Sequence, residues 1–241
     1  MCLIVFSWQI IPGMPLIAAA NRDEFYARAS QHAAWWEDRP NIYAGRDLQS
    51  GGTWLGITRT GRFAAITNIR APEDNRGDAP SRGELVANFL DSQVSAADYI
   101  AQIKPQANVY NGFNLLIGDG QQLHWYSNKG DADVRNGQPL APGIYGLSNG
   151  LFDNCWPKIV RTKAQFSSLL CQSAPDDTYF EMLQDTTRSG DCRLPSTGVG
   201  IERERVLSSV FIESPDYGTR CSTLVKISAN GETSLQERVI R

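Results

Sequence analysis

Residues 2–24 read CLIVFSWQIIPGMPLIAAANRDE, and two apolar runs with a break between them dominate this stretch. The first run extends from Leu3 to Gln9, Pro12-Gly13 breaks it, and the second extends from Pro15 to Ala20. Two apolar strands joined by a short turn predict an antiparallel pair in a sheet that is covered on both faces. Because paired strands run in opposite directions, we expect the polar cluster at 21–24 to lie near Cys2.

Cys2, at the start of the first strand, is a candidate nucleophile. If Met1 is removed, Cys2 becomes the first residue and carries both a thiol and a free α-amine. An α-amine ordinarily has a pKa of about 7.7–8.0, so a fraction of it is neutral near pH 7 and can accept the thiol proton. The alternative role is that of a small, buried and inert core residue. The cysteine by itself does not distinguish the two roles.

The composition is that of a globular chain and gives no reason to propose a nucleic-acid partner. The chain has 241 residues, of which 41% are hydrophobic and 20% charged, with a formal net charge of −3. That slight acidic excess, without any basic run, does not suit binding to nucleic acid or to an anionic membrane surface. The length, with no repeat or linker, predicts a single domain over residues 1–241.

Export, membrane insertion and zinc binding are not expected. No segment approaches the roughly 18 consecutive apolar residues typical of a membrane span, and the first apolar run is short and lacks a basic leader. We therefore expect a cytoplasmic location. The five cysteines are odd in number and scattered, which favours reduced thiols over a disulfide framework, and His32 and His124 are the only histidines.

The rest of the chain is expected to form blocks of strands and blocks of helices. Further strands are predicted at 53–58, 62–68, 113–117, 122–126, 143–148, 208–212, 219–228 and 233–240. Helices are predicted at 81–90, 95–104, 156–171 and 176–184, and residues 38–50 are expected to be irregular. The patterns Ser81-x-x-Glu84 and Ser95-x-x-Asp98 indicate capping boxes for the first two helices. Hairpin turns such as Asn230-Gly231 indicate antiparallel sheets with segregated helices, an α+β fold.

Several short motifs stand where the predicted strands begin or end. They are Met1-Cys2, Asn21-Arg22-Asp23-Glu24, GGTWLG at 51–56, Thr67-Asn68, Gly146-Leu147-Ser148-Asn149 and YGTRCST at 217–223. Together they resemble the NRDE family, also called the transport and Golgi organization 2 family, over most of the chain. The resemblance implies a four-layer αββα sandwich of two antiparallel sheets flanked by helices, like that of N-terminal nucleophile (Ntn) hydrolases. The chain is similar to the branch of these hydrolases that has an N-terminal cysteine, which includes choloylglycine hydrolases and penicillin V acylases.

By this resemblance, the catalytic candidates are Cys2, Arg22, Asp23, Asn68, Asn149 and Arg220. Cys2 would be the nucleophile with its own amine as base, and Arg22 would lower the thiol pKa by stabilising the thiolate. Asp23 would hold the α-amine or orient Arg22, and the two asparagines would hold the oxyanion. Because alternate residues of a strand point to opposite faces, either Arg220 or Cys221 can face the site, and we expect Arg220.

The acidic residues depart from the pattern of the hydrolase branch. That branch usually has its acidic partner a few residues after the arginine, whereas Asp23 and Glu24 follow Arg22 immediately. In an extended strand, Arg22 and Glu24 can share a face that Asp23 does not. Arg22 and Asp23 can also form a purely structural ion pair, and Asn68 and Asn149 can be turn formers.

The resemblance leaves two functions open. One is a hydrolase or acyltransferase that uses Cys2 on a non-peptide C–N, thioester or ester bond of a small acyl substrate, with no cofactor required. The other is a non-catalytic carrier of haem, acyl-coenzyme A or a lipid-like metabolite on the same fold. His32 is then a candidate axial ligand of haem, or simply a surface histidine. The side chains of Trp35, Trp36 and Trp54 are candidates for lining a ligand cleft, or for core packing.

Overall fold

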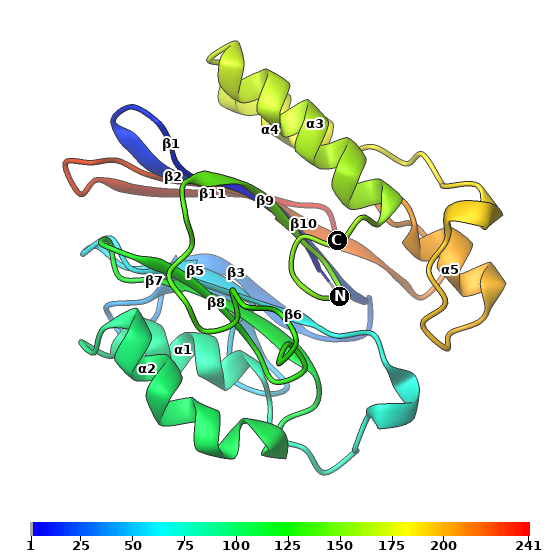
Figure 1. The fold of residues 1–241 in the computed structure, drawn as a ribbon, viewed down its shortest axis with the longest axis horizontal. Coiled ribbons are helices and arrows are strands. Elements are labelled where there is room, and N and C mark those ends of the chain that lie inside the picture. Colours follow the sequence, from blue (N-terminus) through cyan, green and yellow to red (C-terminus); the bar gives the residue numbers. More distant parts are fainter. Residues whose placement is uncertain (1) are drawn as a thin grey trace.

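The computed structural model describes residues 2–241 and contains two antiparallel sheets packed face to face (Figure 1). The first sheet has the strand order β11-β10-β2-β1-β9. Its strands are β1 (Cys2–Ile11), β2 (Met14–Phe25), β9 (Gly143–Leu147), β10 (Tyr217–Ile227) and β11 (Thr233–Val239). The second sheet has the order β3-β4-β5-β6-β7-β8. Its strands are β3 (Ser30–Trp35), β4 (Tyr43–Asp47), β5 (Leu55–Ile57), β6 (Phe63–Asn68), β7 (Phe113–Gly118) and β8 (Leu123–Ser127).

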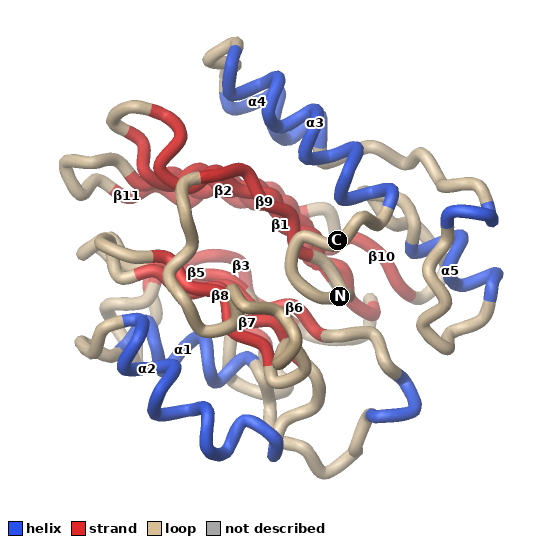
Figure 2. Tube along the Cα trace, in the orientation of Figure 1, coloured by secondary structure: helices blue, strands red, loops and turns tan. Residues whose placement is uncertain are grey.

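Helices cover the outer face of each sheet, so that the molecule has four layers (Figure 2). The helices are α1 (Gly83–Asp91), α2 (Ala96–Ile103), α3 (Pro157–Cys171), α4 (Asp176–Met182) and α5 (Ile201–Leu207). The pair α3 and α4 packs on the first sheet, and the pair α1 and α2 packs on the second. The predicted α+β sandwich with its αββα layering is therefore confirmed. No helix within residues 2–241 combines the length and the apolar character that a membrane crossing requires.

Period-two alternation along β1 separates two of the hydrophobic cores. Ile4, Phe6 and Trp8 point between the two sheets, whereas Leu3 and Val5 point towards α3 and α4. A third core lies between the second sheet and the pair α1 and α2. Because β1 is buried on both faces, its apolar residues form a continuous run in the sequence.

The register of the first hairpin brings the two N-terminal motifs together. Cys2 pairs with Arg22 and Leu3 with Asn21, as antiparallel pairing of β1 and β2 predicts. On the other side of β2, Arg22 pairs with Cys221 of β10, next to a register irregularity between Thr219 and Cys221. The predicted proximity of Cys2 to the cluster at 21–24 is confirmed.

Two expectations about strands are wrong, and the structure adds two elements that were not expected, β3 and α5. Residues 38–50 are not irregular throughout, because they contain β4, and the preceding β3 was not expected at all. Both are short strands that pair with each other around an irregularity, so their alternation is weak in the sequence. Residues 208–212 form no strand. They follow α5 as turns whose backbone amides at Val210 and Phe211 both donate to the carbonyl of Asp185.

The two predicted capping boxes differ in outcome. The Ser95 hydroxyl accepts a hydrogen bond from the Asp98 amide and caps α2, as predicted. Ser81 does not cap α1, because that helix begins at Gly83 with Arg82 at its N-cap and without a side-chain cap. The other predicted strands and helices are confirmed with ends shifted by up to two residues, except that β2 continues beyond the predicted end at Ala20 to Phe25.

Candidate active site

A cavity of about 460 Å³ opens beside the paired ends of β1 and β2. The first sheet contributes Cys2 and Arg22 to its wall, and the second sheet contributes Asp47 and Asn68 from the ends of β4 and β6. The loop before α1 closes another side with residues 76–83. Side chains from both sheets therefore meet at one cavity, which exists only once the two sheets have packed.

Cys2 and Arg22 share one face of the first sheet. They are directly opposite each other across β1 and β2, and opposed residues of paired strands point to the same side. Cys2 is 8% exposed and Arg22 5%. Burial raises the pKa of the Cys2 thiol, and the carboxylates of Asp23 and Glu24 add to the rise, while Arg22 opposes it. The guanidinium thus favours the thiolate in a site whose burial disfavours it.

The Arg22 guanidinium is held between an aromatic ring and two polar groups. It lies 4.1 Å from the centroid of the Trp54 ring, donates to the Ser30 hydroxyl at 3.3 Å and reaches Asp47 at 3.5 Å. Trp54 in turn crosses β4 so closely that a Cβ on Gly45 would stand 2.3 Å from its ring. Glycine at position 45 therefore lets the ring lie where Arg22 stacks on it.

Asp23 directs its carboxylate away from Arg22, as strand alternation predicts. Oδ1 accepts a hydrogen bond of 2.7 Å from the Thr219 hydroxyl, and the Asp23 carbonyl accepts one of 3.0 Å from the Tyr217 hydroxyl. Burial raises the pKa of Asp23, and the nearby Lys158 and the Thr219 hydrogen bond oppose the rise. The structure therefore separates Arg22 and Asp23 onto the two faces of β2 rather than joining them in an ion pair.

Lys158 is a buried charge that the sequence did not reveal. It lies in the first turn of α3, is 2% exposed, and donates to the Leu207 carbonyl at 3.0 Å. Burial lowers its pKa to about 8, and Asp23 limits that fall. In the sequence, Lys158 is an ordinary polar residue near a helix start. Only the packing of α3 against the first sheet shows that it faces Asp23.

The two asparagines form a connected pair rather than two independent donors. Asn68 ends β6 and borders the cavity. The Asn149 side-chain amide donates to the Asn68 carbonyl at 2.8 Å, and the Asn149 carbonyl accepts from the Arg70 amide at 2.8 Å. The adjacent Ser148 hydroxyl donates to the Cys2 carbonyl at 3.0 Å. The segment at 148–149 therefore holds the backbone on both sides of the cavity, and of these two asparagines it is Asn68 that borders the cavity.

Arg220 does not reach the cavity, which corrects the expectation that it faces the site in place of Cys221. Its guanidinium donates to the backbone carbonyls of Phe25, Arg28 and Arg241, each at 2.9 Å. Cys221 is the residue that lies opposite Arg22. The register irregularity between Thr219 and Cys221 interrupts simple alternation, which is why the strand pattern gave the wrong orientation. Arg220 instead fixes the chain that follows β2.

The residues proposed for haem lie apart from Cys2. His32, Trp35 and Trp36 border a separate hollow of about 570 Å³ along β3 and β4. His124 is buried in β8, with its ring nitrogens near the Gln122 side chain and the Gly137 carbonyl. Within residues 2–241, neither histidine borders the Cys2 cavity. Of the tryptophans proposed to line a ligand cleft, Trp54 borders it, and Trp35 and Trp36 do not.

The fold and this site together define an α+β sandwich with a cysteine at the head of a central strand, beside a polar cavity. Residues 1–241 match the family described as Transport and Golgi organisation 2, and the chain belongs to that family. It is 36% identical to the Transport and Golgi organization protein 2 homolog of Bos taurus and 35% identical to that of Homo sapiens. Each alignment covers 99% of this chain and 92% of the relative.

More distant relatives and solved structures extend the comparison. The Transport and Golgi organization protein 2 of Drosophila melanogaster is 28% identical over all of this chain and 92% of its own length. A Caenorhabditis elegans ortholog of N-acylethanolamine-hydrolyzing acid amidase superposes with a TM-score of 0.45 at 9% identity, covering 98% of this chain and 100% of that one. A C2A mutant of conjugated bile acid hydrolase from Clostridium perfringens gives a TM-score of 0.41 at 8% identity, covering 100% and 97%.

Proposed function

We propose that this protein is a cysteine-dependent hydrolase or acyltransferase acting on a non-peptide C–N, thioester or ester bond of a small acyl substrate. The observation that carries the proposal is the placement of Cys2 in the wall of a cavity of about 460 Å³, on one face with the buried guanidinium of Arg22. A fixed cation beside a thiol increases the thiolate fraction, and the thiolate is the nucleophile.

In the proposed reaction, the Cys2 thiol proton passes to a base and Sγ bonds to the acyl carbon. The bond to the leaving nitrogen, sulfur or oxygen then breaks, and the proton goes to the leaving group. Water, or a second acceptor, next takes the acyl group and restores the thiol. The proposed base is the α-amine that Cys2 carries once Met1 is removed, and Met1 lies outside the described residues. Asn68 is the proposed oxyanion donor because it borders the cavity.

A carrier function is the second candidate, and the charge of the cavity wall favours it. The arginines that border the cavity are Arg22, Arg28, Arg76 and Arg82, and the carboxylates are Asp23, Glu24 and Asp47. The small excess of positive charge suits an anionic metabolite such as acyl-coenzyme A. Haem as cargo has less support, because the two histidines of the chain lie elsewhere. Binding without turnover, unaffected by loss of the Cys2 thiol, is the behaviour that would distinguish a carrier.

The test compares Cys2→Ala with Cys192→Ala, a substitution at an exposed cysteine outside the cavity. Turnover of a panel of acyl amides, thioesters and esters is measured alongside intact mass, which reports both Met1 removal and acyl adducts. We expect Cys2→Ala to lose turnover and adduct formation with its thermal unfolding temperature little changed, while Cys192→Ala keeps both. Full turnover in Cys2→Ala would refute the hydrolase. A mass that retains Met1 in an active preparation would refute the α-amine as base.

A further inference from the structure

Two arginines contact the Asp47 carboxylate at the end of β4, and the two contacts differ in length. Its Oδ2 accepts from Arg28 Nε at 2.6 Å and from Arg22 Nη2 at 3.5 Å. Its Oδ1 accepts from the backbone amides of Gln49 and Ser50, each at 3.0 Å. A contact of 2.6 Å is a strong charge-assisted hydrogen bond, whereas 3.5 Å is the outer limit of one. Arg28 therefore makes the stronger hydrogen bond to Asp47, and Arg22 the weaker one.

Arg28 is itself fixed in this position. Its Nη2 donates to the Ser50 hydroxyl at 3.0 Å, and its backbone carbonyl accepts from Arg220 at 2.9 Å. Burial alone would lower the pKa of Arg28, and the hydrogen bond to Asp47 raises it above the ordinary value. Arg28 thus stays charged and attached to the loop that follows β4.

Arg22 has the Asp47 carboxylate at 3.5 Å and the Cys2 thiol as its neighbour across β1 and β2, so a Cys2 thiolate would compete with Asp47 for its charge. Its guanidinium is buried, so in this low-dielectric site it interacts strongly with whichever anion lies closer. The Trp54 ring and the Ser30 hydroxyl hold it without supplying a charge. Without Arg28, Asp47 would be the more accessible anion and would draw the Arg22 guanidinium away from Cys2.

We propose that Arg28 is a positioning residue for the site. Because Arg28 binds the Asp47 carboxylate, the Arg22 guanidinium stays beside Cys2 and stabilises the thiolate of Cys2. This inference rests on the proposed role of Cys2 as nucleophile. It assigns to Arg28 and Asp47 a function in the reactivity of the thiol, although neither residue touches the thiol itself in the contacts described.

Thiol reactivity gives the test, because it does not require a known substrate. The rate of Cys2 alkylation by iodoacetamide is measured against pH by peptide mass spectrometry, with the exposed Cys155, Cys171 and Cys192 replaced by Ser. We expect Arg28→Gln to slow alkylation at pH 7 by about 3- to 10-fold and to move the inflection to higher pH, since one pKa unit is tenfold in thiolate. Arg28→Lys keeps a cation for Asp47 but cannot reproduce both hydrogen bonds of the guanidinium, so its rate is expected to lie between those of wild type and Arg28→Gln.

Two further variants separate positioning from a general change of charge. Asp47→Asn keeps the Oδ1 acceptor for the loop amides but removes the competing charge, so it should match or exceed the wild-type rate. Combined with Arg28→Gln, it should restore the rate. In an Arg22→Gln background, Arg28→Gln should have no further effect if it acts through Arg22. The other titratable groups that interact with Cys2 remain unchanged in all variants, namely Asp23, Glu24, Lys158, Tyr217 and Cys221.

The outcomes are decisive in both directions. An unchanged rate in Arg28→Gln, or an equal loss in the Arg22→Gln background, overturns the positioning role. If Arg28→Gln fails to fold, Asp47→Asn still decides, because slower alkylation of Cys2 in that variant contradicts the proposal. Failure of the proposed function looks different, since it would appear as turnover that survives Cys2→Ala while the alkylation rates still follow Arg28 and Asp47.

Discussion

Arg22, Asp23 and Lys158 are charged residues that are almost completely buried, and β2 keeps the first two apart. Arg22 faces the cavity with Cys2, whereas the Asp23 carboxylate faces the Thr219 hydroxyl and Lys158 on the other side. Burial of an ion costs several kcal/mol unless a partner compensates. Placing one anion and one cation on the far side of β2 lets each reduce that cost for the other.

Lys158 should make the stability of the protein depend on pH in the alkaline range. Its pKa is about 8 in the folded protein, against an ordinary value of 10.5 for an exposed lysine, so between these values the unfolded chain binds more protons than the native one. The free energy of unfolding then rises with pH, by about 3 kcal/mol at most for this group. We expect the advantage of wild type over Lys158→Met to grow accordingly from pH 7 to pH 10.5 in urea titrations. A difference that does not change with pH would show that Lys158 titrates normally.

At the scale of single elements, the starts of α1 and α2 show how the same sequence pattern can lead to different caps. Ser95 has an extended backbone and its hydroxyl accepts from the Asp98 amide. The N-cap of α1 is Arg82 with a helical backbone, because Gly83 packs directly on the chain at Gly52. A Cβ on Gly52 would stand 2.5 Å from the Gly83 carbonyl carbon. That close approach, which is tertiary, decides where α1 begins.

The two serines make a matched pair for mutation. Ser95→Ala removes the hydroxyl that accepts from an otherwise unbonded helix amide, and should lower the free energy of unfolding by about 1 kcal/mol. Ser81→Ala removes no cap and should have little effect on stability. Both are measured by urea denaturation at pH 7. Equal losses from the two substitutions would mean that Ser81 has a stabilising role that its hydrogen bonds do not explain.

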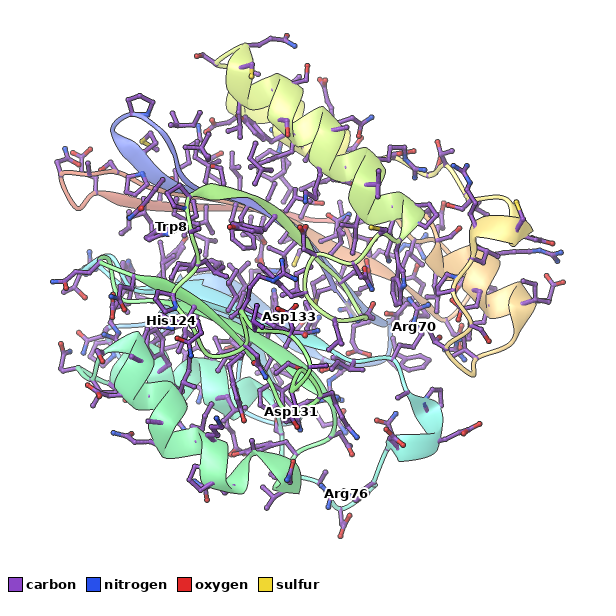
Figure 3. The ribbon with its side chains drawn as sticks, in the orientation of Figure 1. Trp8, Arg70, Arg76, His124, Asp131 and Asp133 are labelled. Carbon is purple, nitrogen blue, oxygen red and sulfur yellow. The ribbon has the colours of Figure 1, made fainter. Side chains whose placement is uncertain are left out.

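At the scale of the whole molecule, a buried ion pair joins the chain at the end of the second sheet to α5. Arg70 follows β6, and its Nη1 contacts Oε2 of Glu204 in α5 at 2.6 Å. Figure 3 shows Arg70 on the side of the sheets that faces α5. Arg76, on the next loop, lies further out and binds the backbone carbonyls of Asn108 and Val109. The chain between β6 and α1 is therefore fastened near its start by Arg70 and at its middle by Arg76, and its second half forms one wall of the cavity.

Glu204→Gln should destabilise the protein strongly, because it leaves the buried Arg70 charge without the carboxylate that it contacts. The expected loss is about 3–5 kcal/mol in free energy of unfolding, measured by urea denaturation. Asp191→Asn, at an ion pair on the surface with Arg205, is the control and should leave the denaturation midpoint unchanged. A loss below about 1 kcal/mol in Glu204→Gln would show that neighbouring polar groups replace the carboxylate.

The sequence by itself determined the parts of this protein that depend on local pattern. Alternation and turn residues specify the first hairpin, and antiparallel pairing then places Cys2 opposite Arg22. The same periodicity predicted most strands and helices, and the motifs at strand ends predicted the family. These features could be predicted because each is encoded within a few consecutive residues.

Only the tertiary structure decided which side chains meet at the site. The irregularity in β10 turns Arg220 away and sets Cys221 opposite Arg22, and the packing of α3 buries Lys158 near Asp23. The partition of Asp47 between Arg28 and Arg22 depends on strands from both sheets and the loop after β2. Contacts of this kind join residues far apart in the chain, and the interaction energy follows distance and burial in space rather than spacing in the sequence.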